Sequence, residues 1–248
     1  MGLREAAASD GAIGGWCTIT APFIAEIMAT GGGFDYVAID CQHGLLDYSG
    51  MVSMLHALAR TPVTPIVRVP SNDWSAIGKA LDAGAHGVIV PMVNSRVEAQ
   101  AAVAACRYAP EGTRSMGPIR ASMSIAGTTA EVNRQVMCFA MIETAEAVAE
   151  AEAICATPGL DGIYVGPHDL AISMGVEPNG GIVAGPLQDA MMHVLSCCRA
   201  AGVVPGTHCA DGAAARVLLD LGFRMASLGG DMTMLRRAIA AELAAVKQ

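Results

Sequence analysis

Residues 81–91 read Leu-Asp-Ala-Gly-Ala-His-Gly-Val-Ile-Val-Pro, and this stretch holds the unit that repeats through the chain. A helix-forming segment, Ser75–Ala83, ends at Gly84, and the apolar run Gly87–Pro91 begins three residues later. Glycine is common just past the end of a helix, and a short apolar run between glycine and proline is typical of a strand buried on both faces. The stretch therefore predicts a helix that leads directly into a buried strand.

The same unit recurs before and after this stretch. Gly202 and Gly222 also separate helix-forming segments from short apolar runs. The candidate strands are Ile13–Cys17, Tyr36–Asp40, Pro65–Val69, Gly87–Pro91, Met137–Ile142, Gly162–Gly166, Val203–Thr207 and Met225–Leu228. The candidate helices are Pro22–Thr30, Tyr48–Arg60, Ser75–Ala83, Ser95–Arg107, Ala145–Ala156, Pro186–Ala201, Gly212–Leu221 and Met232–Val246. Eight such units in 248 residues predict a closed (β/α)8 barrel, the TIM barrel, as a single domain over residues 1–248. A doubly wound open sheet is the alternative, although none of the candidate strands leads into a G-x-G-x-x-G turn.

One segment departs from this repeat. Residues 108–135, between a candidate helix and a candidate strand, are rich in proline, glycine, serine and threonine, with a short helix expected at Thr128–Gln135. A loop insertion of this length inside a compact domain usually serves function or contacts a partner.

Composition excludes several classes of protein. Lys and Arg total 15 against 23 Asp and Glu, and the resulting net charge of −8 argues against nucleic acid and anionic membranes as partners. No apolar run approaches the ~20 residues of a membrane span. A hydrophobic content of 53% with only 15% charged residues excludes disorder and suggests that subunit contacts cover part of the surface. The 8 cysteines are irregularly spaced without a C-x-x-C pair, as expected for buried thiols in a cytoplasmic protein.

Polar and aromatic residues gather at the carboxyl ends of the candidate strands, where barrel enzymes place their active sites. With their immediate neighbours, they are Trp16, Asp40, Cys41, Gln42, His43, Arg68, Glu143, Thr144, Gly166, Pro167, His168, Asp169, Thr207, His208, Gly229, Gly230 and Asp231. Although these residues are far apart in the sequence, the predicted barrel brings them to one end.

The residue types at these strand ends indicate metal and anion chemistry. Glu143 and Asp169 follow consecutive strands, and paired carboxylates suit Mg²⁺ or Mn²⁺; the alternative is that both are acids in the first turn of a helix. Arg68 lies on an interior strand and needs an anion, either a substrate or a structural ion-pair partner. His43 is suited to act as a general base near neutral pH, and the backbone after Gly166 is suited to hold a carboxylate or phosphate.

These residues belong to an ordered series of longer matches to one family. The matching segments are Gly33–Tyr36, Ile39–His43, Val67–Pro70, Leu81–Gly84, Ile89–Val93, Tyr108–Arg114, Met141–Thr144 and Val165–Leu170. On these segments, spread over nearly the whole chain, it resembles the metal-dependent (class II) pyruvate aldolases of the HpcH/HpaI family, within the phosphoenolpyruvate/pyruvate barrel superfamily. The resemblance implies reversible cleavage and formation of 4-hydroxy-2-keto acids from an aldehyde and a 2-keto acid donor, pyruvate or hydroxypyruvate, through an enolate stabilised by a divalent metal.

The resemblance also implies roles for single residues. Glu143 and Asp169 match the two ligands of the metal, which is expected to be Mg²⁺, Mn²⁺ or Co²⁺. Arg68 matches the arginine beside the keto oxygen. His43 and Asp82 match a histidine–aspartate dyad whose histidine moves the proton of the aldol hydroxyl.

Substrate contacts follow in the same way. The backbone at His168 and Asp169, after Gly166 and Pro167, matches the clamp on the donor carboxylate, and Trp16 and the loop with His208 are expected to shape the aldehyde pocket. Two positions depart from the family: Gln42 stands where glutamate is frequent, and Met141 where a substrate-contacting glutamine is usual. Because a neutral hydrogen bond contributes ~0.5–1.5 kcal/mol, these changes are expected to retune affinity.

Asp82 implies an assembly. It lies at the end of a helix before the fourth strand, at the opposite end of its own barrel from the site, so a role beside His43 requires a neighbouring subunit. We therefore expect a homo-oligomer with sites at subunit interfaces, and hexamers are usual in the family.

The alternative functions are an oxaloacetate decarboxylase or an acyl-CoA lyase on the same barrel, and a non-catalytic barrel that binds a keto acid. The sequence has no clear Arg and Lys cluster that would bind CoA.

Overall fold

The computed structural model describes residues 2–178 and 185–247, and within them eight parallel strands close into one barrel in chain order. The strands are β1 (Ala12–Cys17), β2 (Tyr36–Asp40), β3 (Thr64–Arg68), β4 (Gly87–Val90), β5 (Met137–Ile142), β6 (Gly162–Val165), β7 (Val204–His208) and β8 (Met225–Ser227). Every neighbouring pair is parallel, including β8 with β1. The predicted (β/α)8 barrel is confirmed, and every predicted strand is present to within two residues of its expected ends.

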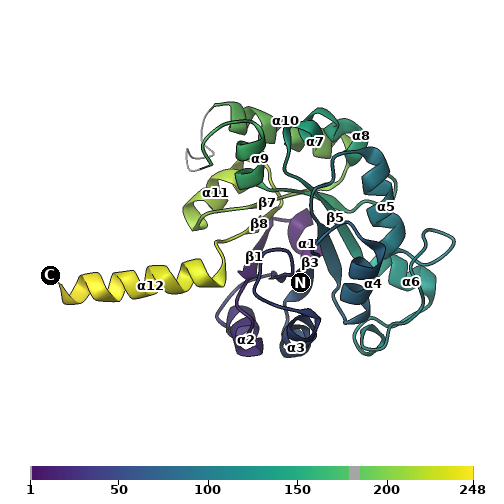
Figure 1. Ribbon diagram of the computed structural model, residues 1–248, viewed down its shortest axis with the longest axis horizontal. Helices are drawn as coiled ribbons and strands as arrows, with labels where there is room; N and C mark the ends of the chain where they lie inside the picture. Colours follow the sequence, from purple (N-terminus) through teal and green to yellow (C-terminus); the bar gives the residue numbers. More distant parts are fainter. Residues whose placement is uncertain (1, 179–184, 248) are drawn as a thin grey trace.

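Most of the helices surround the barrel on its outside, and α12 extends away from it (Figure 1). They are α1 (Leu3–Ala8), α2 (Pro22–Thr30), α3 (Tyr48–Leu58), α4 (Trp74–Asp82), α5 (Arg96–Cys106), η1 (Ala121–Met123), α6 (Thr129–Gln135), α7 (Ala145–Ala149), α8 (Ala151–Cys155), α9 (Pro167–Ser173), α10 (Pro186–Ala201), α11 (Gly212–Leu221) and α12 (Asp231–Val246).

Helices α1, α7, α8 and α9 differ from the sequence-based expectation. The segment 145–156 forms two helices, α7 and α8, because Glu150 leaves the helical dihedral region at φ −97° and ψ 7°. The six-residue helix α1 was not predicted, nor was α9, in which Pro167 occupies the first turn. Short helices carry too few turns to show an apolar periodicity, so they leave little signal in a sequence.

The barrel interior is a packed core rather than a channel. Helix α1 contributes Leu3 to an apolar cluster that also contains Tyr36 and Tyr164 inside the barrel, and the Leu3 amide donates to Thr64 Oγ1 at 3.2 Å. Gly14 is required here because a Cβ at this position would lie 2.1 Å from the Tyr36 ring. A filled interior leaves substrate access only at the ends of the barrel.

The segment 108–135 packs back against the amino end of the barrel. Within it, Arg120 donates to the carbonyl oxygens of Ala83 at 2.7 Å and Leu55 at 3.0 Å, and Asn133 makes two hydrogen bonds with the backbone of Tyr108. The predicted short helix is present as α6, capped by Thr128. The insertion is therefore held far from the carboxyl ends of the strands.

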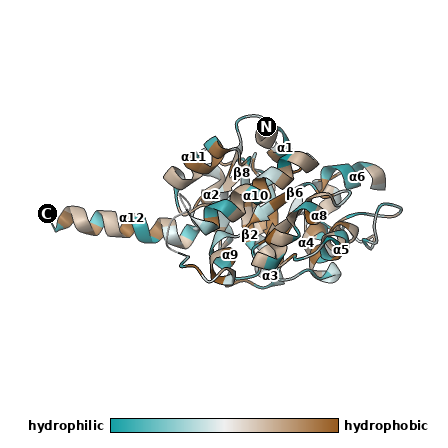
Figure 2. Cartoon of the chain, turned by 90° about the horizontal axis from the view of Figure 1, so that it is seen from above, coloured by the Kyte–Doolittle hydropathy of each residue, from teal (hydrophilic) through white to brown (hydrophobic). Residues whose placement is uncertain are grey.

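Helix α12 departs from the barrel and extends away from it (Figures 1 and 2). Among its sixteen residues, only Asp231 at its start is buried. In residues 2–178 and 185–247, none of the helices has the length and apolarity that crossing a bilayer requires.

Candidate active site

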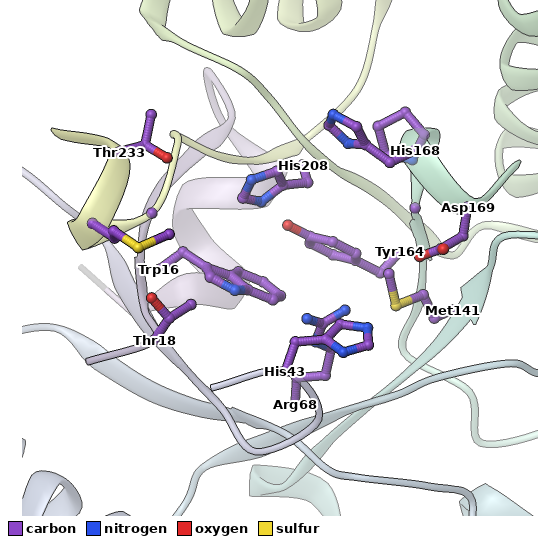
Figure 3. A pocket seen from close by; sticks show the side chains of 14 residues that line it. Trp16, Thr18, His43, Arg68, Met141, Tyr164, His168, Asp169, His208 and Thr233 are labelled. Atoms are coloured by element: carbon purple, nitrogen blue, oxygen red, sulfur yellow. The ribbon is translucent and has the colours of Figure 1, made fainter. Parts of the chain in front are cut away.

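A cavity of about 260 Å³ opens at the carboxyl ends of the strands (Figure 3). The residues predicted for the site that line it are Trp16, His43, Arg68, Met141, Gly166, Pro167, His168, Asp169 and His208. Asp40, Gln42 and Glu143 lie behind its surface, and Asp82 lies elsewhere. The cavity is also lined by Gly230, which the sequence placed at a strand end, and by Thr18, Tyr164, Met232 and Thr233, which sequence reasoning missed.

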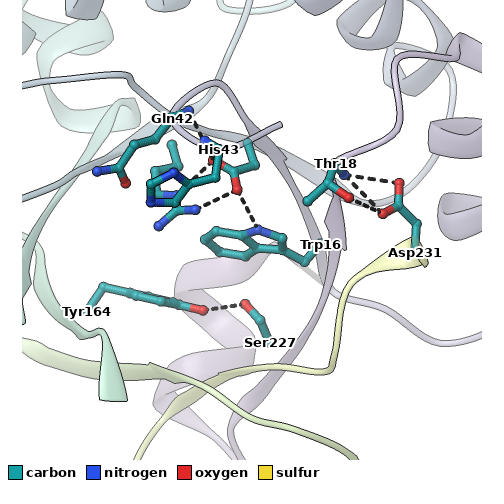
Figure 4. A network of polar contacts seen from close by, with 9 residues as sticks. Trp16, Thr18, Gln42, His43, Tyr164, Ser227 and Asp231 are labelled. Carbon is teal, nitrogen blue, oxygen red and sulfur yellow. Dashed lines mark hydrogen bonds and ion pairs between the residues drawn. The ribbon is translucent and has the colours of Figure 1, made fainter. Parts of the chain in front are cut away.

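One buried ion pair organises the floor of the cavity (Figure 4). The register of β2 with β3 places Asp40 directly beside Arg68, and the two side chains make a bidentate pair at 2.9 Å and 2.5 Å. Burial favours the neutral form of Asp40, but the hydrogen bonds and charge of Arg68 outweigh it and hold the pKa of this carboxyl below its ordinary value. The pair uses Nε and Nη2 of the guanidinium, which leaves Nη1 for a group in the cavity.

The Asp40 carboxylate also accepts hydrogen bonds from the residues around Arg68. Asp40 accepts hydrogen bonds from the indole Nε1 of Trp16 at 3.2 Å and from the backbone amides of Gln42 and His43 at 3.0 Å and 3.2 Å. The guanidinium in turn lies 5.0 Å from the centre of the Trp16 ring. Asp40 therefore fixes the arginine, the tryptophan and the loop that carries His43 with one side chain.

Aromatic side chains form one wall of the cavity, facing the pair of Asp40 and Arg68. Trp16 stacks on Tyr164 with ring centres 5.6 Å apart and meets His208 edge-on at 5.2 Å. The hydroxyl of Tyr164 donates to Ser227 at 2.6 Å, so the ring is held from below. Burial, with the nearby charges of His168 and Arg68, lowers the pKa of His208 to about 4.

Glu143 lies just behind the cavity, one residue past the end of β5. Burial raises the pKa of this carboxyl to about 7, and the negative charge of Asp169 adds to the shift. Its Oε1 accepts from the Met92 amide at 2.8 Å, whereas Oε2 is buried and has no hydrogen-bond partner within residues 2–178 and 185–247. Gly166 leaves room for this oxygen, since a Cβ there would lie 2.7 Å from it.

The backbone of Met92 supports Glu143, and no sequence pattern predicts this contact. Its φ of 55° lies in the left-handed region, which non-glycine residues rarely adopt, and this conformation accompanies the amide that binds Glu143. Such conformations gather at functional sites.

The carboxylate pair fits a divalent cation. Two carboxylates that repel each other, one with an unpartnered buried oxygen, are the donor set that a hard cation favours, with water and substrate oxygens completing its coordination. In the described part of the chain, the His, Cys, Asp and Glu side chains form no group of three placed to hold a metal.

Asp231 is a second anchoring carboxylate, which the sequence placed among the residues at the strand ends without a role. It accepts from the amide and hydroxyl of Thr18 and from the amide of Ile19, at 2.7–3.1 Å (Figure 4). These bonds fix the loop after β1 to the start of α12. Its position after Gly229-Gly230 at the end of β8 was the only signal.

Asp82 and Gln42 stand apart from the cavity. Asp82 ends α4 and pairs with the guanidinium of Arg114, whose side chain is buried, at 2.8 Å. Gln42 donates its amide to Asp40, while its side-chain Oε1 is buried without a hydrogen-bond partner in the described residues. The structure therefore does not bring Asp82 to the site of its own chain.

The fold and this arrangement of residues define a (β/α)8 lyase barrel with a carboxylate pair, an arginine and a histidine around one small cavity. The model of the HpcH/HpaI aldolase/citrate lyase family matches residues 13–238, so the chain belongs to this family and is a carbon–carbon lyase.

Similar proteins align with this chain over nearly their full length. A hydroxypyruvate/pyruvate aldolase of Rhizorhabdus wittichii is 40% identical over 92% of this chain and 90% of its own. A 4-hydroxy-2-oxo-heptane-1,7-dioate aldolase of Salmonella arizonae is 36% identical over 95% of this chain and 91% of its own. The crystal structure of an HpcH/HpaI aldolase/citrate lyase family protein from Burkholderia cenocepacia superposes with a TM-score of 0.91 at 33% identity, covering 99% of this chain and 98% of that one.

Proposed function

We propose that this protein is a class II aldolase that cleaves and forms 4-hydroxy-2-keto acids from an aldehyde and a small 2-keto acid donor. The observation that carries the proposal is the buried Glu143 beside Asp169, at a cavity that also presents Arg68 and His43. The relatives named hydroxypyruvate/pyruvate aldolase support pyruvate or hydroxypyruvate as donor. A cavity of about 260 Å³ suits substrates of this size.

Glu143 and Asp169 would hold the metal, and Mg²⁺, Mn²⁺ or Co²⁺ suits these oxygen ligands. When bound, the cation supplies a Lewis acid that polarises the keto group of the donor and favours its enolate. The sequence leaves an acyl-CoA lyase and an oxaloacetate decarboxylase as alternatives, and none of the described residues that line the cavity favours either.

The other side chains of the site act on the substrate directly. Arg68, held rigid by Asp40, places positive charge toward the keto oxygen as negative charge develops there. His43 takes the proton from the aldol hydroxyl during cleavage and returns it during synthesis. The backbone amides of His168 and Asp169 bind the donor carboxylate, and Trp16 and Met141 exclude water from the reacting carbon.

We further propose a homo-oligomer with sites at subunit interfaces, working in the cytoplasm. Helix α12 exposes a stripe of apolar side chains at helical spacing, each at least 50% exposed: Met232, Leu235, Ile239, Leu243 and Val246. Exposed apolar residues also stand on the two helices that flank β8 and β1, Phe23 and Ile27 on α2 and Val217 on α11. The helix after β8 ordinarily belongs to the ring around the barrel, so α12 of a second copy is the occupant that fits this surface.

The first test requires no knowledge of the aldehyde. Exchange of the methyl protons of pyruvate into D₂O, followed by NMR with Mg²⁺ or Mn²⁺ and again with EDTA, is expected to be fast and metal-dependent. For the alternative donor, hydroxypyruvate, which has no methyl group, exchange of the two C3 protons is followed in the same way. Absence of exchange with both donors would favour a keto-acid-binding barrel without catalysis.

A further inference from the structure

His208 is held in the wall of the cavity with an unused hydrogen-bonding atom. It ends β7, where the neighbouring amide of Cys209 donates to Ser227 at 2.8 Å and the hydroxyl of Thr207 donates to the Val165 carbonyl at 3.2 Å. Its ring is fixed edge-on against Trp16. Its Nδ1 is buried and has no hydrogen-bond partner anywhere in residues 2–178 and 185–247.

A buried polar atom without a partner is uncommon because it loses its bond to water on folding. The side chains nearest to His208 do not repair this loss. Trp16 presents its ring to the imidazole and gives its N–H to Asp40, and the Tyr164 hydroxyl is bonded to Ser227. The other ring nitrogen, Nε2, is not buried and makes no hydrogen bond within the described residues, so Nε2 is the atom that a group in the cavity can reach.

The surroundings define what that group is. His208 is enclosed by aromatic rings. The positive charges of the nearby Arg68 and His168 favour the neutral form of its imidazole. A neutral imidazole presents one N–H donor and one acceptor nitrogen. A hydroxyl, which both donates and accepts, matches either nitrogen, whereas a carboxylate matches only the donor.

The other neutral groups of the cavity are largely engaged. The Thr18 hydroxyl donates to Asp231 at 2.7 Å, so it is committed to the loop after β1. Thr233 lies beyond Trp16, on the side of the cavity away from Tyr164 (Figure 3). His208, in contrast, lies beside Trp16 and Tyr164, above both in the view of Figure 3, and lines the cavity.

We infer that His208 is a specificity-determining residue that hydrogen-bonds a neutral hydroxyl of the substrate. The inference rests on the proposed aldolase function and extends it to one polar group of the substrate. The hydroxyl has two possible sources: the one on C3 of a hydroxylated donor such as hydroxypyruvate, or the one beside the carbonyl of a hydroxyaldehyde.

A two-by-two set of substrates separates these sources. Pyruvate and hydroxypyruvate are each paired with acetaldehyde and with glycolaldehyde, and kcat/KM is measured for wild type and for His208→Leu. Loss of one neutral hydrogen bond is expected to lower kcat/KM about two- to twelvefold for the substrate that carries the hydroxyl. The matched substrate without it is expected to keep its rate.

Two further variants make the result specific. His208→Gln retains a hydrogen-bonding side chain and is expected to recover part of the preference that His208→Leu loses. It also serves as the test variant if the leucine variant does not fold. His193→Leu, on the exposed face of α10 away from the cavity, is the matched control and is expected to behave as wild type.

The outcomes are distinct. A loss confined to the two hydroxypyruvate pairs assigns the hydroxyl to the donor, and a loss confined to the two glycolaldehyde pairs assigns it to the acceptor. An equal loss for all four pairs, or no change in any, overturns the inference while the aldolase function stands. If wild type converts none of the pairs, the proposed function fails and the inference fails with it.

Discussion

At the scale of single residues, the site depends on the buried pair of Asp40 and Arg68. Removing one partner of such a pair leaves the other charge uncompensated, which typically costs about 3–5 kcal/mol of stability. The pair therefore serves two purposes: it allows a guanidinium to exist inside the barrel, and it aims that guanidinium at the cavity.

Arg68→Ala is expected to lower kcat about 10²–10³-fold, by analogy with the loss of one donor from an oxyanion hole. Circular dichroism is the control, because the variant also leaves Asp40 without its partner. A decrease of less than about threefold in a folded variant would reject the role of Arg68 at the keto oxygen.

Glu143→Ala and Asp169→Ala are each expected to abolish metal-dependent proton exchange, because a two-ligand site keeps too few protein oxygens when one is lost. Glu146→Ala, in the exposed first turn of α7, is the matched control and should retain exchange. The measurement is the rate of pyruvate exchange across a Mn²⁺ titration. Full activity of wild type in EDTA would contradict the metal site.

At the scale of elements, α12 buries only Asp231 among its sixteen residues. Its apolar stripe needs cover, since exposed apolar surface of this extent marks an interface. The polar start of the helix is nevertheless tied to the site through Asp231 and Thr18. In the proposed oligomer, α12 would therefore connect the subunit contact with the shape of the cavity.

Leu235→Arg combined with Ile239→Arg is expected to convert the oligomer into monomers, because two charges would have to be buried in an apolar contact. Analytical ultracentrifugation is the measurement. Ala241→Arg combined with Ala244→Arg adds the same two charges on the opposite, exposed face of the helix and should leave the assembly intact. An unchanged sedimentation coefficient in the arginine variant would refute the assigned contact.

At the scale of the whole molecule, Asp82 can join His43 only across an interface, since in its own chain it pairs with Arg114. Mixing refolded His43→Ala and Asp82→Ala subunits should then restore activity, because a mixed dimer contains one site with both native residues. Random pairing predicts recovery of roughly a quarter of the wild-type activity. A mixture as inactive as its components would place Asp82 outside the reaction.

The stability of the whole molecule is expected to depend on His208 in acid. Its pKa is lowered from 6.5 to about 4, so as the pH falls the unfolded chain takes up this proton first. The contribution of the neutral His208 imidazole to the free energy of unfolding is complete above pH 6.5. It is lost between pH 6.5 and 4, to a maximum of roughly 3 kcal/mol for the shift to about 4. Urea unfolding at pH 7 and pH 4.5 should show a smaller loss for His208→Leu than for wild type.

The barrel itself could be predicted from the sequence because its signals are local. The glycine after a helix at Gly84, Gly202 and Gly222 has positive φ in each case, as helix ends of this kind require. Each buried strand carries its own apolar run, so eight strands were found without knowledge of their partners. The residues at the strand ends were found for the same reason, since their place along the chain is enough to bring them to one end of a barrel.

Other features were decided only by the tertiary structure, because they depend on which side chains share one buried volume. The bond between Asp40 and Arg68 comes from the register of β2 with β3, and the raised pKa of Glu143 comes from its enclosure beside Asp169. Met92 takes a left-handed conformation that its own residue type disfavours, and α12 leaves the barrel although its pattern is that of an ordinary amphipathic helix. The sequence by itself determined the elements and the chemical groups available at their ends, whereas packing between distant segments determined which of those groups are paired and which remain free for a ligand.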